Sequence, residues 1–214
     1  MTPHQFDRLH VHGTEVRLWQ VDLNAPAEAR LLSSDERERA ERLLIPEKRR
    51  QFIAARAGLR QILGVVTGRP PEFLIFGVQA DGKPFLEDAS GWEFNLAHSD
   101  DAALVAVARS PVGIDLERER PLSGMAHMAE IAFSPQEQAE LNQLPADDQQ
   151  RAFFRTWTRK EALLKGYGTG FRLAHTFSLP VSDQPLTIAI GPWMITDLET
   201  RPGFFAALAI RGPS

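Results

Sequence analysis

The apolar positions along the chain follow two different periods. Stretches in which apolar and polar residues alternate, interrupted by Gly, Pro and Asp, predict β-strands. Two longer stretches, at about 34–63 and 134–165, have apolar residues three or four positions apart and predict helices. The predicted strands are 16–23, 73–78, 103–108, 112–117, 176–179, 186–190, 193–198 and 204–210. This order of elements predicts an α+β fold.

The two helical stretches also resemble each other. Ser33 and Ser134 each have a Glu three residues on, as in a helix capping box. An offset of 101 residues without a gap matches Ser33 with Ser134, Glu36 with Glu137, Leu43 with Leu144, Arg50 with Arg151, Phe52 with Phe153 and Leu63 with Leu164. The repeat predicts a pseudo-dimer of two similar lobes, 1–100 and 101–214, each a helical segment packed on an antiparallel sheet. A functional site is expected in the cleft between the lobes.

Charged residues interrupt the apolar stripe of both predicted helices. Glu161 and Lys165 share a helical face with Trp157, although buried charges are rare unless they are paired or bind a metal. The same offset matches Arg56 with Trp157 and Arg60 with Glu161. A single arginine at such a position usually snorkels or pairs with a surface acid, but two of them four residues apart favour an anion site.

The stretch VGIDLERERP adds two further carboxylates. Its alternation places Asp115 and Glu117 on one face of a strand, beside Gly113. A solvent-facing edge strand would explain this pair alone. Together with Glu161, however, the pair makes an oxygen-rich site suited to Mg²⁺, and Lys165, one helical turn further on, is placed to hold a phosphate oxygen.

Composition narrows the classes of function. The net charge of −4 gives no basic footprint for binding nucleic acid. There is no apolar run of membrane-spanning length, and MTPHQFDRLH lacks the apolar core of a secretory signal, so a cytoplasmic protein without membrane contacts is expected. With no cysteine, a metal site must use oxygen or imidazole ligands.

Two shorter motifs precede these acids. FNLAHS is expected to form a short strand that ends in a turn at His98 and Ser99, and DGKP to form a turn from which Lys83 projects, followed by Pro84. With Arg56 and Arg60 they supply the positive groups that a ligand with several phosphates needs.

VGIDLE followed by WTRKEALLK, with DGKP and FNLAHS upstream, resembles the signature of the 4′-phosphopantetheinyl transferase superfamily, in its two-domain, surfactin-synthetase-activating type. The resemblance implies transfer of the 4′-phosphopantetheine arm from coenzyme A to a serine of an acyl or peptidyl carrier protein, with release of 3′,5′-ADP. It implies a monomer whose site lies within one chain.

The resemblance also implies roles for particular residues. Asp115, Glu117 and Glu161 would bind Mg²⁺, with Mn²⁺ as the alternative, and Lys165 would contact the pyrophosphate. Contacts with coenzyme A would come from Arg60, Lys83, Pro84, His98, Ser99 and Lys160, and contacts with its 3′-phosphate from Lys48 and Arg56. One departure from the family's usual pattern is Ala97, where a Ser is common.

Several alternatives stay open at this point. The base that accepts the serine proton is expected to be Glu161, with Glu137 or a metal-bound water as alternatives. A non-catalytic module that binds coenzyme A, or another Mg²⁺-dependent nucleotide phosphodiesterase, would use some of the same residues. The segment 121–133, with Met125 and Met128, would serve either as a docking surface for the carrier or as core.

Overall fold

The computed structural model describes residues 3–11, 13–87 and 91–213. The strands are β1 His4–Val11, β2 Thr14–Asp22, β3 Phe76–Val78, β4 Pro84–Leu86, β5 Glu93–Ser99, β6 Ala102–Ala108, β7 Val112–Arg118, β8 Thr187–Ile190, β9 Trp193–Leu198 and β10 Phe204–Arg211. The helices are α1 Ser34–Glu41, α2 Pro46–Thr67, α3 Met125–Ala132, α4 Pro135–Gln143 and α5 Ala146–Tyr167, with short 3-10 turns at Ala29–Leu31, Pro71–Phe73 and Gly170–Leu173. The predicted α+β class is confirmed.

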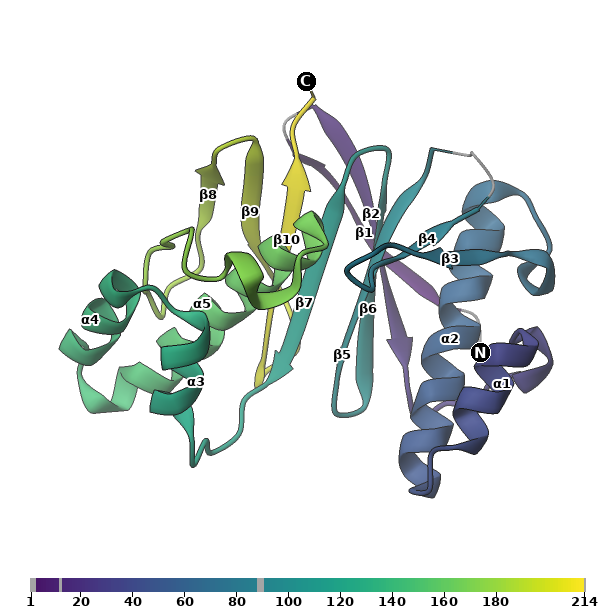
Figure 1. Ribbon diagram of the computed structural model, residues 1–214, viewed down its shortest axis with the longest axis horizontal. Helices are drawn as coiled ribbons and strands as arrows, with labels where there is room; N and C mark the ends of the chain where they lie inside the picture. Colours follow the sequence, from purple (N-terminus) through teal and green to yellow (C-terminus); the bar gives the residue numbers. More distant parts are fainter. Residues whose placement is uncertain (1–2, 12, 88–90, 214) are drawn as a thin grey trace.

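Among the described residues, two antiparallel sheets repeat one strand order. The first sheet runs β1-β2-β6-β5 and the second runs β7-β10-β9-β8. If β2, β6 and β5 are matched with β7, β10 and β9, the shared part of each sheet has its strands in the same order. The hairpin of β3 and β4 forms a separate two-stranded sheet beside α2 (Figure 1).

The sheets pack face to face between layers of helices (Figure 1). One apolar cluster joins the inner faces of the two sheets and includes Val16, Leu18, Leu104, Ile114, Leu116 and Leu208. A second cluster packs α2 on the other face of the first sheet, through Leu59, Ile62, Trp19, Val21 and Val105. A third packs α5 on the second sheet, through Ala162, Leu163, Ile195 and Ala207. The alternation predicted for VGIDLE is therefore confirmed, since Val112, Ile114 and Leu116 all face the first sheet.

The bounds of the two long helices show that the offset of the repeat along these helices is 100 residues, where the sequence predicted 101. Both α2 and α5 have 22 residues, and each ends at a left-handed glycine, Gly68 or Gly168. Their bounds differ by 100 positions, whereas the capping-box serines Ser33 and Ser134 differ by 101. The expected match of Arg60 with Glu161 is therefore wrong, because one residue is lost between the capping box and the long helix. Arg60 lies at the position of Lys160.

Prolines explain why each predicted helical stretch is divided. Pro46 begins α2 and Pro135 begins α4, while Pro145 caps α5. Proline has no N–H and clashes with the preceding turn, so it suits the start of a helix and interrupts one elsewhere. The strand predicted at 176–179 is absent from the structure, since the N–H of Leu179 donates to Glu137 Oε1 (2.7 Å) instead of a sheet.

The first sheet extends further along the chain than expected. β6 pairs with both β2 and β5, so Ala102–Ala108 belongs with the first sheet. The change from one sheet to the other comes at 109–111, after the predicted boundary at 99–101. Among the described residues, no helix has the length and apolar character needed to cross a membrane.

The substitution Gly113→Ala is expected to destabilise the fold by on the order of 3 kcal/mol or more. A Cβ at Gly113 would lie 2.0 Å from the carbonyl oxygen of Ala162 and 2.4 Å from the nitrogen of Gly166, both in the backbone of α5. Gly124→Ala is the matched control, since a Cβ there meets nothing within 4 Å. Chemical denaturation measures both changes, and equal stability of the two variants would contradict this close contact.

Candidate active site

The close approach of β7 to α5 buries Asp115 against Lys165. Asp115 is only 4% exposed, and the Lys165 ammonium lies 2.5 Å from its Oδ1. Its other oxygen, Oδ2, is buried and has no hydrogen-bond partner among the described residues. Burial raises the pKa of Asp115, while Lys165 opposes the shift. The strand face that carries Asp115 is therefore buried against α5 and does not face solvent.

Glu117 connects the two sheets at the next position on the same face. Ser99 Oγ, at the end of β5, donates to Glu117 Oε2 (3.1 Å) and accepts from the N–H of Arg118 (3.1 Å). Burial and the charge of Asp115 raise the pKa of Glu117, and the bond from Ser99 works against this. Ser99 thus fixes a carboxylate of the second sheet from the first.

The pKa of Glu161 is raised well above its ordinary value. Burial raises its pKa to about 7, Lys165 opposes the shift, and the charges of Asp115 and Glu117 add to it. Burial alone would lower the pKa of Lys165, but Asp115, Glu161 and Glu117 raise it. One ammonium therefore shares its charge among three carboxyl groups, and Glu161 can change protonation near neutral pH.

His98 and Lys48 lie at the edge of this cluster. Although the His98 ring is partly exposed, its protein surroundings displace enough water to lower its pKa, and the charges of Lys165 and Lys48 lower it further. Asp115 opposes the shift. The histidine is thus neutral at neutral pH, with Lys48 from the start of α2 and Lys165 from α5 both within electrostatic range of its ring.

Lys83 links the two halves of the molecule. Its ammonium is buried and donates to the carbonyl oxygens of Val112 and Gly166, both at 3.0 Å. Burial lowers the pKa of Lys83, and Glu93 opposes the shift. Through the bond to Gly166, Lys83 holds the end of α5 beside Lys165, and its expected contact with coenzyme A stays a prediction. Pro84 follows it as the first residue of β4.

Arg60 and Arg56 are engaged by the capping-box glutamate of α1. Arg60 is 1% exposed, and its Nε donates to Glu36 Oε2 (2.6 Å) while its Nη1 donates to the carbonyl oxygens of Pro71 and Leu74. Arg56 Nε donates to Glu36 Oε1 (2.6 Å). In this structure the two arginines compensate the carboxylate of Glu36, and the expected anion site stays a prediction.

Lys160 repeats this arrangement in the second half. Its ammonium pairs with Glu137 Oε2, and both side chains are buried. Glu137 also accepts from the N–H groups of Ser134 (2.6 Å) and Leu179 (2.7 Å). A carboxylate so fully engaged is unsuited to accept a substrate proton, which argues against Glu137 as the base. It also argues against a direct contact of Lys160 with coenzyme A.

The oxygen ligands of the cluster fit the chemistry of a divalent cation. The orphaned Asp115 Oδ2 and the raised pKa values of Glu117 and Glu161 indicate negative charge that one lysine does not compensate. In the part of the chain that the structure describes, however, no three carboxylate or imidazole side chains are grouped to hold a metal. Asp115, Glu117 and Glu161 nevertheless interact electrostatically with one another and with Lys165, whose ammonium pairs with Asp115, and their role as metal ligands stays a prediction.

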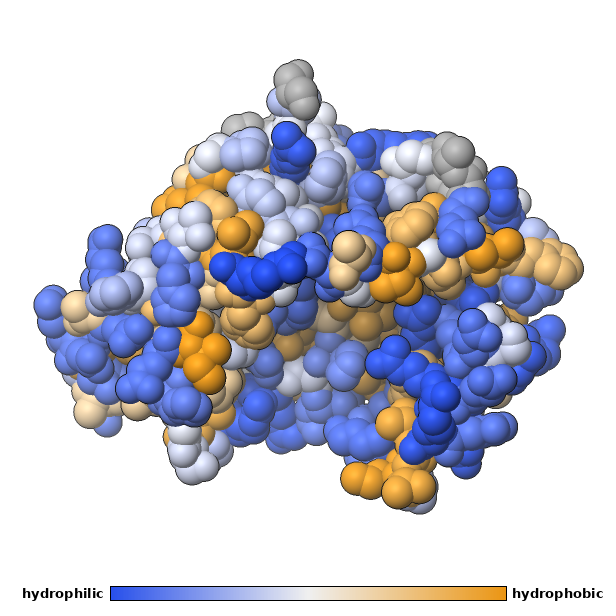
Figure 2. Space-filling model, viewed as in Figure 1, coloured by the Kyte–Doolittle hydropathy of each residue, from blue (hydrophilic) through white to orange (hydrophobic). Residues whose placement is uncertain are grey.

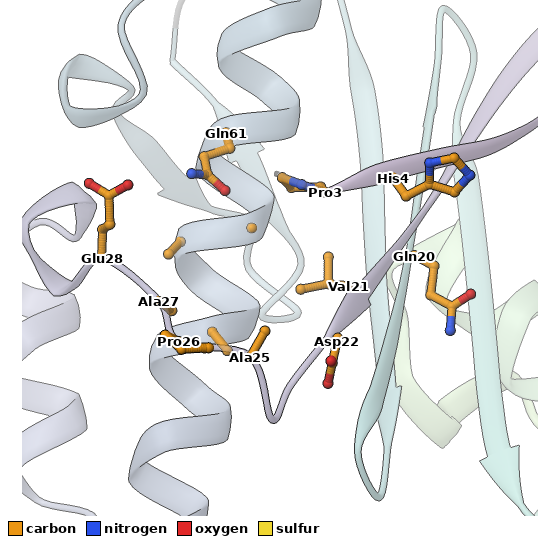
Figure 3. A pocket seen from close by; sticks show the side chains of 13 residues that line it. Pro3, His4, Gln20, Val21, Asp22, Ala25, Pro26, Ala27, Glu28 and Gln61 are labelled. Carbon is orange, nitrogen blue, oxygen red and sulfur yellow. The ribbon is translucent and has the colours of Figure 1, made fainter. Parts of the chain in front are cut away.

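Figure 2 shows the surface hollowed between the two helical sides of the molecule. A separate cavity of about 160 Å³ lies between β2 and α2 (Figure 3). It is lined by His4, Gln20, Val21, Glu28 and Gln61, among others, and by none of the predicted site residues.

Known proteins resemble this chain over most of its length. Residues 111–199 match the 4′-phosphopantetheinyl transferase superfamily. The 4′-phosphopantetheinyl transferase HetI of Nostoc sp. is 39% identical over 209 residues, which cover 92% of this chain and 88% of the relative. The chain belongs to the 4′-phosphopantetheinyl transferase superfamily.

Other members of the superfamily support the same assignment. The 4′-phosphopantetheinyl transferase Sfp of Bacillus subtilis is 30% identical, with 86% of this chain and 89% of the relative covered. The 4′-phosphopantetheinyl transferase psf-1 of Bacillus pumilus is 30% identical, with 86% and 80% covered. The prediction that this protein is an enzyme of the phosphopantetheinyl transferase family is confirmed.

Sequence reasoning missed one residue that supports the site. Asn95, buried in β5, accepts the N–H of Ile114 on β7 through its Oδ1 (2.9 Å). This bond ties the strand that carries His98 and Ser99 to the strand that carries Asp115. The signal was a polar side chain in the otherwise apolar middle of FNLAHS, on the same strand face as Ala97 and Ser99.

We expect Arg60→Met to lower the free energy of unfolding by about 3 kcal/mol, because it removes a buried partner of the Glu36 carboxylate and leaves the carbonyl oxygens of Pro71 and Leu74 without their donor. Arg56→Met is the control and should cost roughly 1 kcal/mol or less, since that side chain is partly exposed. Urea denaturation measures both. A stable Arg60→Met variant with a raised KM for coenzyme A would instead support the original anion-site interpretation.

Glu161→Gln is expected to stabilise the metal-free protein above neutral pH. The pKa of Glu161 is about 7 in the folded chain and near 4.5 ordinarily, so the folded state binds the proton more tightly. Its ionisation therefore reduces stability as the pH rises from about 4.5 to 7, and the amide removes this loss. The gain should grow from near zero at pH 4.5 to roughly 1–3 kcal/mol at pH 8. Thermal melts across this range test it, with the exposed Glu130→Gln as control.

Proposed function

We propose that this protein transfers the 4′-phosphopantetheine arm of coenzyme A to a serine of an acyl or peptidyl carrier protein, in a Mg²⁺-dependent reaction that releases 3′,5′-ADP. The observation that carries the proposal is the undercompensated cluster of Asp115, Glu117 and Glu161 around one ammonium, that of Lys165. Such a cluster can receive a cation together with a pyrophosphate.

Asp115, Glu117 and Glu161 would hold the Mg²⁺, with the orphaned Asp115 Oδ2 as the best prepared ligand. When bound, the ion supplies positive charge against the pyrophosphate as its P–O bond breaks. Lys165 would move its ammonium from Asp115 to a phosphate oxygen, which is a short change for a flexible side chain with three donors. Mn²⁺, which also accepts carboxylate oxygens, is the alternative ion.

Glu161 is the proposed base. In the reaction the carrier's serine oxygen attacks the phosphorus that bears the pantetheine arm, and the bond from that phosphorus to the oxygen of the leaving 3′,5′-ADP breaks. The hydroxyl proton passes to the Glu161 carboxylate. In the metal-free protein the pKa of Glu161 is about 7, so its carboxylate there accepts a proton more readily than an ordinary glutamate does.

Partly exposed cations and a neutral imidazole would bind the nucleotide end of coenzyme A. His98 and Lys48 lie on the open edge of the cluster and can donate to phosphate oxygens. Ser99 would act mainly by orienting Glu117. Arg56, Arg60, Lys83 and Lys160 would support these elements through the bonds described above.

Glu161→Gln is expected to lower kcat at least about a thousandfold, because the amide can neither accept the proton nor contribute a charged ligand. The assay is mass spectrometry of an apo carrier protein, which gains one phosphopantetheine, with chromatography of the released 3′,5′-ADP. Omission of divalent cation from the native enzyme should give a similar loss.

The control for this prediction is the solvent-exposed Glu130→Gln, which should retain full activity. Near-native transfer by folded Glu161→Gln at saturating Mg²⁺ would remove this residue from the mechanism. Release of 3′,5′-ADP without any carrier protein would favour a nucleotide phosphodiesterase, and binding of coenzyme A without turnover would favour a regulatory module.

A further inference from the structure

The loop between α1 and α2 exposes large apolar side chains. Leu44 is 92% exposed and Ile45 is 61% exposed. They adjoin a shallow groove to which Leu43, Pro46 and Ile53 contribute. Neighbouring exposed apolar residues with a polar rim commonly mark a surface that a partner covers.

Positive charge surrounds this apolar tip. Arg42, Lys48, Arg49 and Arg50 are all exposed, and the only acids between positions 41 and 50 are Glu41 and Glu47. Three of these cations donate hydrogen bonds to neutral groups: Lys48 to Gln51, Arg49 to the carbonyl oxygen of Ala40, and Arg50 to Asn24. The surface is thus basic on a chain whose net charge is −4.

We call Arg42, Leu43, Leu44, Ile45, Pro46, Lys48, Arg49 and Arg50 the α1–α2 patch. Figure 2 shows orange and deep blue surface side by side at the lower right, where Figure 1 places the turn from α1 into α2. An apolar ridge flanked by cations complements an amphipathic helix whose apolar side chains are flanked by carboxylates.

The α1–α2 patch adjoins the carboxylate cluster. Gln51 Nε2, at the start of α2, donates to the carbonyl oxygen of Asp100 (3.0 Å), and the preceding residue, Ser99, holds Glu117. Lys48 belongs to the patch and also lies within electrostatic range of His98, as Lys165 does. A protein seated on the patch would therefore lie next to the place where its own side chain is to be modified.

We propose that the α1–α2 patch docks an acidic amphipathic helix of the carrier protein. The inference rests on the proposed transfer to a carrier serine and assigns the surface that recognises the protein substrate. Leu44 and Ile45 pack against the apolar side chains of that helix, and Arg42, Arg49 and Arg50 pair with its carboxylates.

The test compares two double variants with two matched controls. Leu44→Ser with Ile45→Ser removes the apolar tip, and Arg42→Glu with Arg50→Glu reverses part of the charge. The controls are Val65→Ser, which changes an apolar residue that is 77% exposed further along α2, and Arg8→Glu, on β1. Steady-state kinetics with an apo carrier protein, following 3′,5′-ADP release, give KM separately for the carrier and for coenzyme A.

Both patch variants should raise the KM for the carrier about tenfold or more, with the KM for coenzyme A and the kcat at saturating carrier unchanged. The controls should match the native enzyme. Added NaCl should raise the carrier KM of the native enzyme more than that of the charge-reversed variant.

Three results would overturn the inference. An unchanged carrier KM in both patch variants, with normal transfer by the native enzyme, would refute docking and leave the proposed function standing. A parallel rise in the KM for coenzyme A would assign the patch to the nucleotide, and patch-dependent binding to anionic phospholipid vesicles with an unchanged carrier KM would assign it to a membrane surface. If the native enzyme modifies none of a panel of apo carriers, the proposed function itself fails.

Discussion

The ion pair of Lys165 with Asp115 is the interaction on which the rest of the site depends. It lies in the contact between β7 and α5 that only a glycine at position 113 permits, and it is the nearest compensation for three carboxyl groups. Because one ammonium cannot balance three carboxylates in a poorly hydrated place, Glu161 holds its proton up to about pH 7. The cluster therefore lowers the stability of the free protein, and the proposed binding of a cation and a phosphate would supply the missing compensation.

The glutamates of the two capping boxes are also shielded from water, but unlike the three acids around Lys165 they have enough positive partners. Glu36 meets two arginines, and Glu137 meets Lys160 and two backbone N–H groups. There the negative charge is fully compensated, and the pKa of Glu36 is lowered, because its arginines and Ser33 outweigh the effect of burial. Charge balance thus separates the capping-box carboxylates from those for which we propose a catalytic role. Burial does not separate them, since both kinds are largely shielded from water.

Local periodicity predicted the site better than it predicted the partners of the site. The helical phase of Glu161 and Lys165 and the strand phase of Asp115 correctly brought acids and lysine together, because each rests on a few neighbouring residues. Arg60 was misassigned, since one deleted residue between capping box and helix shifts every later match. Lys83 bonds to two backbone carbonyls that are distant in sequence, Val112 and Gly166, and no residue pattern records such a partner. The strand β1 was also missed, because its edge position leaves little apolar alternation.

The packing of the two sheets explains why one chain suffices to build the cluster. β5 contributes Ser99 and His98, β7 contributes Asp115 and Glu117, and Asn95 ties the two strands together across the sheets. The apolar cluster between the inner faces holds this alignment without any ligand. Lys83 adds a third link, from the β3–β4 hairpin to the end of α5. Each half therefore positions charged groups of the other. Neither half alone would place Glu117, held by Ser99, beside Asp115, held by Lys165.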